Sequence, residues 1–405
     1  MTRVRRSACE VTGRGVVSSL GLSVASFGSA LLEGRSAIGD LGELAAGLRF
    51  SRGAPVRDFV PTDHFEAREL GQIDRFSQYA VVAARQAWSE AGLGGGGVDP
   101  ARVGVVIGTA NGGVDALQDG FRRLYAEKTS PKPLTIPQTM ASAPASRIAR
   151  EIGAHGPVFG VSSACASAAH AIIVGASFLR SGLVDVMVVG GTDSCFGEGY
   201  MRAWDSLRVV SPDGCRPFSI DRRGFVLGEG AGVLVLERPG HAAQRGALAV
   251  ADYLGGGMSC DAGDLLAPDP GGMVAAMRNA LADAGIAADA VGYVNAHGTA
   301  TGANDRAEAM AVGTVFGGRR VPISSSKSMI GHAMGAAGAL EALATLAALE
   351  RGMLPPTIGI TTLDPELDID PIADVAREAA IDVAMSNSFA FGGLDVSLLF
   401  GRPGV

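Results

Sequence analysis

The sequence has few cysteines, and none of them is spaced as a metal-binding pair. Five cysteines occur among 405 residues, at positions 9, 165, 195, 215 and 260. Their number is odd and no C-x-x-C pair occurs, so the pattern favours neither a zinc site nor a disulfide framework. We therefore expect a cytoplasmic protein that binds no metal ion.

Long apolar runs, basic blocks and aromatic side chains are also scarce. The most apolar segments are broken by charged residues such as Arg180 and Asp185, and the basic start, Met1–Arg6, is not followed by an apolar run. Neither a membrane span nor a signal peptide is predicted. The formal net charge is −7, with two tryptophans and five tyrosines. We therefore expect no nucleic-acid partner.

The remaining composition is that of a well-packed α/β protein, with 47% hydrophobic residues and 58 glycines. Strand patterns alternate with helical ones, which predicts mainly parallel sheets packed between helices. The predicted strands cover 7–20, 103–107, 184–191, 228–237, 249–256, 291–297, 321–326 and 384–400. The predicted helices cover 23–33, 74–92, the apolar stretch after Cys165, 271–285 and 335–350, with a loop and one further helix in 116–150.

Two parts of the chain repeat the same order of elements. The unit of a strand and a buried helix around Cys165 has a counterpart at 323–349, and the glycine turn and strand at 228–236 has one at 392–400. A repeat of half the chain length predicts two similar α/β halves. We place them at 1–245 and 246–405.

Cys165 is the first candidate for a reactive group. It lies where a short extended run enters a long apolar helix. In the first turn of a helix, the macrodipole lowers the pKa of a thiol, and the free backbone N–H groups can stabilise an oxyanion. The alternative is that Cys165 is a small buried hydrophobic residue.

Two histidines have glycine neighbours that would let a substrate approach closely. His297 ends a predicted strand, and His332 lies between Lys327 and Glu341, which could form a buried ion pair. The alternative for each histidine is a purely structural role, which we assign to the other four. The glycine turn at 108–113 departs from the dinucleotide-binding pattern, so no cofactor is predicted there.

Five motifs together carry a resemblance that spans nearly the whole chain. They are Ser163-Ala-Cys-Ala-Ser167, Gly228-Glu-Gly-Ala-Gly232, Asn295-Ala-His-Gly-Thr-Ala-Thr301, Lys327-Ser-Met-Ile-Gly-His332 and Asn387-Ser-Phe-Ala-Phe-Gly-Gly393. In this order, the chain resembles an elongating β-ketoacyl-[acyl-carrier-protein] synthase of the thiolase superfamily. The resemblance implies a duplicated five-layer α-β-α-β-α architecture. It also implies a decarboxylative Claisen condensation of a malonyl thioester with an acyl group on Cys165.

The resemblance assigns a role to each site residue. His297 and His332 would drive decarboxylation, and Lys327 with Glu341 would organise the site. The N–H groups of Cys165 and Phe391 would form an oxyanion hole. The substrate-binding residues would be Thr299 and Thr301 for the phosphopantetheine arm, and Asn111, Phe389, Phe391 and Gly392 around the acyl chain. The protein would need no cofactor, because the arm is carried by the acyl carrier protein, its expected partner.

Some positions depart from the family pattern. Ala390 replaces a glycine, Leu394 and Asp395 stand where Thr-Asn is frequent, and Arg223 stands where an acidic residue is common. Asn111 replaces an apolar residue near the acyl tunnel, which favours a polyketide or polyene substrate. The alternatives are a fatty-acid elongating synthase, a non-catalytic chain-length factor and a thiolase. A homodimer and a heterodimer with a chain-length factor both stay open.

Overall fold

The computed structural model describes residues 9–404, so Met1–Arg6 and the start of the predicted strand 7–20 lie outside the described residues. Eleven strands form one hydrogen-bonded network. In spatial order they are β12 (Asp370–Pro371), β10 (Pro322–Ser324), β9 (Val291–Asn295), β14 (Val383–Ala390), β15 (Leu394–Gly401), β8 (Ala251–Cys260), β1 (Cys9–Ser18), β7 (Gly230–Glu237), β6 (Val186–Asp193), β4 (Val103–Gly108) and β5 (Val158–Val161).

The network consists of two equivalent sheets joined at a short junction. Only residues 9–11 of β1 pair with residues 251–253 of β8. On one side, β1, β7 and β6 are antiparallel neighbours, and β6, β4 and β5 are parallel. On the other, β8, β15 and β14 are antiparallel, and β14, β9 and β10 are parallel. The predicted duplication is therefore confirmed, and the boundary at 245/246 lies between α9 (His241–Gln244) and β8.

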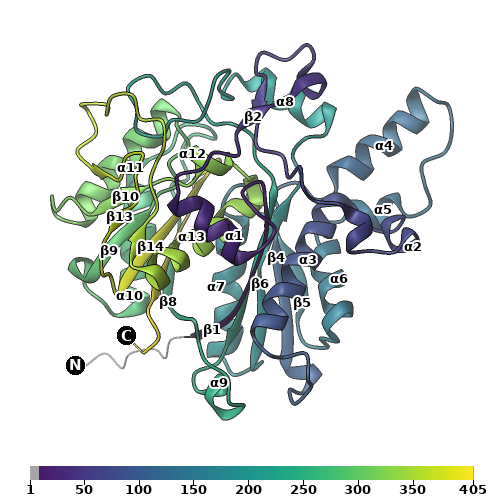
Figure 1. Cartoon of the computed structure of the whole chain (residues 1–405), viewed down its shortest axis with the longest axis horizontal. Coiled ribbons are helices and arrows are strands. Elements are labelled where there is room, and N and C mark those ends of the chain that lie inside the picture. The colour runs from purple at the N-terminus through teal and green to yellow at the C-terminus, as the bar shows by residue number, and fades with distance from the viewer. Residues whose placement is uncertain (1–8, 405) are drawn as a thin grey trace.

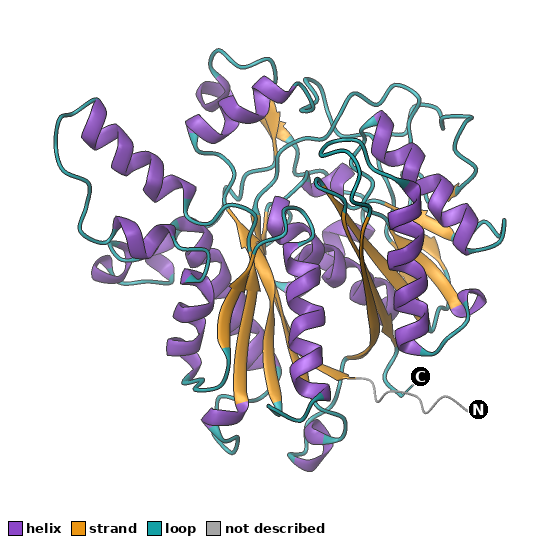
Figure 2. Cartoon of the chain, turned by 180° about the vertical axis from the view of Figure 1, so that it is seen from behind, coloured by secondary structure: helices purple, strands orange, loops and turns teal. Residues whose placement is uncertain are grey.

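Helices form three layers around the two sheets (Figures 1 and 2). In the middle, α7 (Ser167–Arg180) and α13 (Ala337–Arg351) contact each other and strands of both sheets. α3 (Arg75–Glu90) and α6 (Ala143–Ile152) cover the outer face of the first sheet, and α10 (Pro270–Ala284), packed against α11 (Gly302–Val315), covers that of the second. The predicted five-layer architecture is confirmed, and α13 is buried from Ala337 to Leu349 because both of its faces meet a sheet.

Shorter elements lie at the edges of these layers (Figure 1). The helices are α1 (Val24–Leu32), α2 (Ala67–Leu70), α4 (Val114–Tyr125), α5 (Thr135–Thr139), α8 (Glu198–Leu207) and α12 (Lys327–Ile330). Two small antiparallel pairs join β2 (Gly39–Asp40) to β3 (Arg52–Gly53) and β11 (Met353–Leu354) to β13 (Arg377–Glu378). No helix among residues 9–404 is long and apolar enough to cross a membrane.

The prediction of a loop and one helix in 116–150 is wrong. The structure has α4, α5 and α6 there, and α4 projects from the body of the molecule (Figure 1). Pro131 and Pro133 lie in the connection between α4 and α5, whereas Pro144 stands in the first turn of α6. Proline is tolerated in a first turn because its missing N–H would have no intrahelical partner. These prolines therefore lie between helices or in a first turn, where they do not interrupt the hydrogen bonds of a helix.

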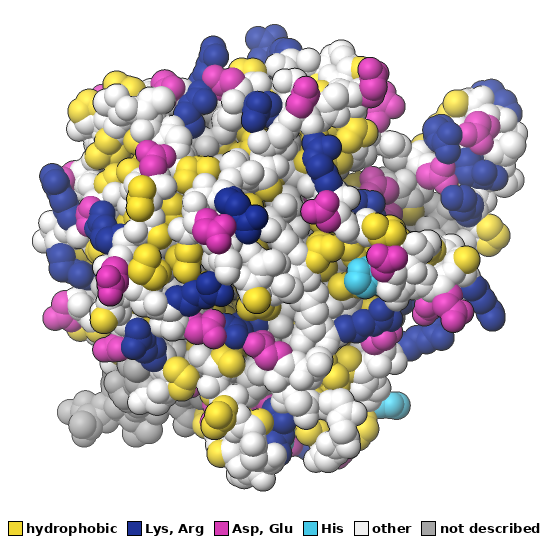
Figure 3. Space-filling view, viewed as in Figure 1, with side chains coloured by type: hydrophobic (Ala, Val, Ile, Leu, Met, Phe, Trp, Pro, Cys, Tyr) yellow, Lys and Arg dark blue, Asp and Glu magenta, His cyan; other side chains and the backbone are white. Residues whose placement is uncertain are grey.

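Charge is mixed over the face of the molecule seen in Figure 1. Lys and Arg side chains alternate with Asp and Glu side chains across the body and on the projecting arm (Figure 3). On α4 and the loop after it, Asp119 pairs with both Arg122 and Lys132. This face therefore carries no broad surface of a single sign.

Candidate active site

Cys165 lies in the turn between β5 and α7. The helix begins at Ser167, so Cys165 precedes the N-cap residue, Ala166. The Ser167 hydroxyl donates to the Ala164 carbonyl at 2.6 Å. Ala164 has a φ of 48°, which is uncommon for a residue with a side chain. This strained turn is held by its own hydrogen bonds and directs the thiol, 7% exposed, into a pocket.

His332 faces the thiol from the second half of the chain. Its Nε2 lies 3.0 Å from Cys165 Sγ. The His332 N–H donates to the Val226 carbonyl at 2.7 Å, and the Gly228 N–H donates to the His332 carbonyl at 3.0 Å. The glycine-rich motif at 228–232 therefore positions His332, and the distance to the thiol permits direct proton exchange.

His297 is the second histidine of the same pocket. Its ring centroid lies 5.4 Å from that of His332, with the two rings nearly perpendicular. Lys327 Nζ is 3.2 Å from His297 Nδ1 and donates to the His297 carbonyl at 2.5 Å and to Glu341. Because a lysine ammonium can only donate, Nδ1 of His297 accepts and its proton resides on Nε2. The predicted buried pair of Lys327 and Glu341 is confirmed, with both side chains 1% exposed.

The electrostatics of the site favour neutral groups. Burial, with the nearby Lys327 charge, holds the pKa of both His297 and His332 well below the ordinary value. The predicted low pKa of Cys165 is wrong, because burial raises the pKa of the thiol to about 12 and Lys327 only partly opposes this. The thiol also lies before the helix rather than in its first turn. Cys165 therefore keeps its proton at rest, and the reaction itself must remove it.

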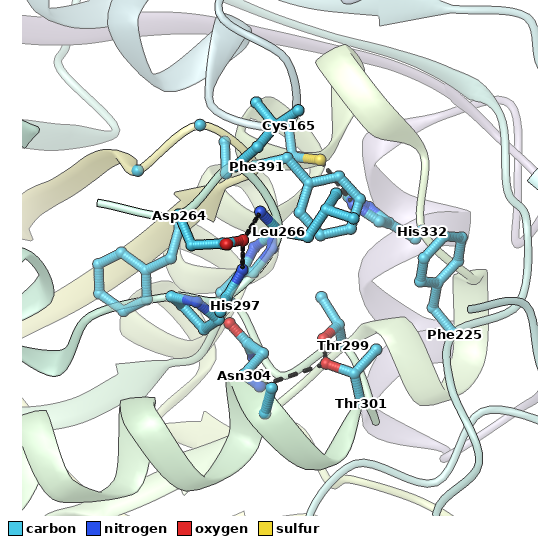
Figure 4. Close-up of a pocket in the computed structure, with 18 of the residues that line it drawn as sticks. Cys165, Phe225, Asp264, Leu266, His297, Thr299, Thr301, Asn304, His332 and Phe391 are labelled. Atoms are coloured by element: carbon cyan, nitrogen blue, oxygen red, sulfur yellow. Dashed lines mark hydrogen bonds between the residues drawn. The ribbon is translucent and has the colours of Figure 1, made fainter. Parts of the chain in front are cut away.

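One pocket collects most of the residues predicted from the sequence (Figure 4). Those that line it are Cys165, His297, His332, Thr299, Thr301, Phe389, Phe391 and Gly392. The Thr299 and Thr301 hydroxyls lie 2.9 Å apart on the wall formed by α11 and the strand end before it. The backbone N–H of Phe391 also faces the thiol and, against the larger effect of burial, lowers the pKa of Cys165.

Asn111 is not among the residues that line this pocket. It is exposed, and its side-chain amide donates to the Tyr200 hydroxyl. Of the other unusual positions, Ala390 lines the pocket beside the Phe391 loop, whereas Arg223 is exposed and 4.0 Å from Asp213. The structure thus brings together every predicted site residue except Asn111.

Sequence reasoning missed several residues of the site. Trp204 of α8 and Phe225 line the pocket, and the loop 264–268 forms its outer rim. The Asp264 carboxylate accepts from the Leu266 and Ala267 N–H groups, so hydrogen bonds within the loop hold its shape (Figure 4). Leu265 accepts from the Gly392 N–H at 2.9 Å, which links this rim to the Phe391 loop. Among residues 9–404, no group of three or more His, Cys, Asp and Glu side chains is arranged to hold a metal ion.

Asp395 is buried directly behind the Phe391 loop. It is 2% exposed, and its Oδ2 has no hydrogen-bond partner among the described residues. Burial, together with the charges of Asp261, Glu308 and Asp269, raises the pKa of Asp395 to about 7. The unfolded chain would release this proton near pH 3.8, so the folded state loses stability as pH rises from about 4 to about 7 and then levels off.

We expect Asp395→Asn to stabilise the protein at pH 8 and to have little effect at pH 4. The expected gain in the free energy of unfolding is about 2–4 kcal/mol above pH 7, because an amide carries no charge to bury. Denaturant unfolding at a series of pH values measures it. Asp368→Asn, which changes an exposed carboxylate, is the control and should show no such pH dependence. A gain of equal size at pH 4 and pH 8 would contradict this account.

Comparisons with known proteins agree with this geometry. Residues 7–242 match the family model "Beta-ketoacyl synthase, N-terminal domain", and residues 250–361 match "Beta-ketoacyl synthase, C-terminal domain". Nodulation protein E of Rhizobium sp. (strain N33) is 44% identical over 96% of this chain and 98% of its own length. The 3-oxoacyl-[acyl-carrier-protein] synthase 2 of Synechocystis sp. is 36% identical over 99% of this chain and 100% of its own.

A solved structure gives the same result for the fold. The ishigamide ketosynthase/chain length factor superposes with a TM-score of 0.94 and 34% identity, covering 98% of this chain and 100% of its own.

Proposed function

Given that this chain belongs to the β-ketoacyl synthase family of condensing acyltransferases, we propose that it joins an acyl group on Cys165 to a malonyl thioester on an acyl carrier protein. The observation that carries the proposal is the 3.0 Å contact between Cys165 Sγ and His332 Nε2, with His297 beside it in the same pocket. A non-catalytic chain-length factor would not need a cysteine and two histidines arranged in one pocket.

The first half-reaction is acyl transfer. Cys165 loses its proton to His332 as its sulfur attacks the carbonyl carbon of the acyl thioester. The N–H groups of Cys165 and Phe391 hold the tetrahedral oxyanion. When the carbon–sulfur bond to the carrier breaks, the departing thiolate takes the proton from His332, so the imidazole returns to its neutral form.

The second half-reaction is decarboxylation and condensation. The malonyl thioester loses CO2, and the electron pair of the broken bond forms an enolate. Its oxygen is held by the Nε2–H of His297, whose proton Lys327 fixes there, and by His332 once the neutral ring carries its proton on Nε2 rather than on Nδ1. The carbanion attacks the acyl-cysteine carbonyl, the bond to sulfur breaks, and the Cys165 thiolate takes up a proton from solvent water. No step requires a metal or a resident cofactor.

The proposed partners are an acyl carrier protein and a second synthase-like chain. Thr299 and Thr301 offer hydroxyls to a phosphopantetheine arm at the pocket wall. β5 is an edge strand of the sheet network, and the nearby α4–α5 arm exposes large apolar side chains. An exposed edge strand beside an apolar surface favours pairing with another chain. The chain-length-factor complex among the structural neighbours supports a heterodimer, and a homodimer is the alternative.

We assign the condensation to a specialised acyl pathway of the polyketide or polyene kind within the cytoplasm. Support comes from a solved structure of a type II PKS acyl-carrier protein in complex with its ketosynthase bound to the hexaketide, which superposes with a TM-score of 0.91 and 28% identity over 98% of this chain. A fatty-acid elongating synthase is the alternative, and the two differ in the acyl chains they accept.

The proposal is tested by incubating the purified chain with acyl-loaded and malonyl-loaded carrier proteins and measuring the β-ketoacyl product by mass spectrometry. Formation of a product two carbons longer is the expected result. Activity of the chain alone would show that no second synthase-like chain is required, whereas activity only after co-expression with a homologous chain would identify a heterodimer. No product under either condition would contradict the proposed function.

A further inference from the structure

Two loops meet at the mouth of the pocket and hydrogen-bond to each other. One is the Phe391 loop, and the other is the segment 261–269, which we call the rim loop; residues of both line the pocket. The Gly392 N–H donates to a carbonyl of the rim loop at 2.9 Å, and the Asp261 N–H donates to the Gly393 carbonyl at 3.1 Å. Separating the two loops therefore breaks both hydrogen bonds and widens the mouth of the pocket.

The side chain of Asp261 lies directly against the Phe391 loop. A Cβ atom on Gly393, which has a φ of 68°, would overlap Asp261 Oδ1, so only glycine leaves room for this carboxylate. The carboxylate is fixed in this position because it accepts from the N–H groups of Gly263 at 3.2 Å and Asp269 at 3.1 Å. The rim loop thus holds a negative charge against the backbone of the Phe391 loop.

Asp395 lies behind the same contact, as the second residue of β15. A Cβ atom on Gly272 of α10 would lie 2.5 Å from Asp395 Oδ2 and 2.9 Å from Asp261 Cβ, so the two acidic side chains border on one point. Asp395 is buried, and its Oδ2 has no hydrogen-bond partner among the described residues. The other titratable groups that face Asp395 are Asp269, before α10, and Glu308 of α11, and both are acidic.

We propose that ionisation of Asp395 loosens the contact between the Phe391 loop and the rim loop, so that the mouth of the pocket opens more readily in mildly alkaline than in mildly acidic solution. As an uncharged acid, Asp395 packs beside the Asp261 carboxylate without repulsion. Once ionised, it places a second negative charge there, in a buried position that water screens little. Because Asp261 is fixed against Gly393, the repulsion acts on the contact between the loops, whatever substrate the pocket takes.

The titration of Asp395 falls in the range where such a change is useful. Burial and the facing acids raise the pKa of Asp395 to about 7, so it is uncharged at pH 6 and ionised at pH 8. Burial also raises the pKa of Glu308 to about 7, but its carboxylate is bound to the N–H groups of His297 and Gly298, which belong to neither loop. The pair formed by Asp395 and Asp261 is therefore the one that acts between the loops.

The experiment measures amide hydrogen exchange of the whole chain by mass spectrometry at pH 6 and pH 8, corrected for the intrinsic exchange rate at each pH. Peptides covering 258–268 and 388–394 report the two loops, and a peptide of β9 reports wider opening of the same sheet. In the natural protein, protection of the two loops should fall about tenfold more than that of β9, since like charges that change a pKa by one unit change an equilibrium by that factor.

Asp395→Asn should show no such difference between the loops and β9. Asp261→Asn, which removes the facing charge and retains one acceptor oxygen, should remove most of it, so the test does not depend on a single variant. Asp368→Asn, which changes an exposed carboxylate, is the matched control and should behave like the natural protein. Equal falls in the loops and in β9 would reduce the effect to overall stability and overturn the inference. Protection that does not fall in the natural protein, or that still falls in Asp395→Asn, would overturn it as well.

Discussion

Replacing Cys165 with alanine is expected to abolish acyl transfer and therefore condensation. Alanine cannot form the thioester, and the Cys165 sulfur is the group that lies 3.0 Å from His332 Nε2. Loss of the nucleophile from a catalytic unit lowers turnover by about 10⁶-fold in well-studied enzymes. Intact mass should show no acyl adduct, and the β-ketoacyl product should disappear.

The same variant should continue to decarboxylate malonyl thioester, because that step uses His297 and His332 rather than the thiol. The matched control is Cys195→Ala, which changes another fully buried free cysteine of the same apolar cluster. It should retain the adduct and the product, with at most a modest loss of stability from the lost sulfur. An acyl adduct that persists in Cys165→Ala and is absent from Cys195→Ala would contradict the assigned nucleophile.

The layered fold was predictable because the local sequence pattern of its central elements indicates their structure. The stretch 337–349 is so apolar that only a helix covered on both sides could contain it, and it lies between the two sheets. The repeated glycine turns and strands at 228–236 and 392–400 allowed the duplication to be predicted. The arm 114–152 was less predictable, because its prolines are compatible with a helix only at particular positions, such as the first turn of α6. Spacing alone does not say which turn a proline occupies.

The catalytic centre was predictable from its motifs, whereas its surroundings were not. Cys165, His297 and His332 lie in glycine-rich segments of distinctive composition, but Trp204 and Phe225 lie in segments whose pattern indicates only apolar packing. Their place beside Phe391 depends on how α8 packs, which is set by contacts distant in sequence. The prediction of a low pKa for Cys165 was wrong because that pKa, too, depends on residues distant in sequence. Local sequence suggested a helix terminus, but burial by both halves of the chain outweighs that effect.

Replacing Lys327 with methionine is expected to damage the protein in two separable ways. The ammonium pairs with Glu341 and contacts Nδ1 and the carbonyl oxygen of His297. Its loss leaves the buried Glu341 carboxylate without a countercharge, and removing one partner of a buried ion pair costs about 3–5 kcal/mol. It also frees His297 to place its proton on Nδ1. Decarboxylation should then fall by about 10²–10³-fold, as when one oxyanion donor is lost.

The double variant Lys327→Met/Glu341→Gln separates these two effects. Because Gln has no charge to bury, the double variant should regain most of the lost stability in denaturant unfolding. It should not regain decarboxylation, since nothing restores the donor to His297 Nδ1. Acylation of Cys165 should fall less than decarboxylation in both variants, because Lys327 acts on the thiol and on His332 only through its charge, whereas it contacts His297 directly. If decarboxylation recovered together with stability, Lys327 would serve only to neutralise Glu341, and the proton on His297 would have to be fixed by another group.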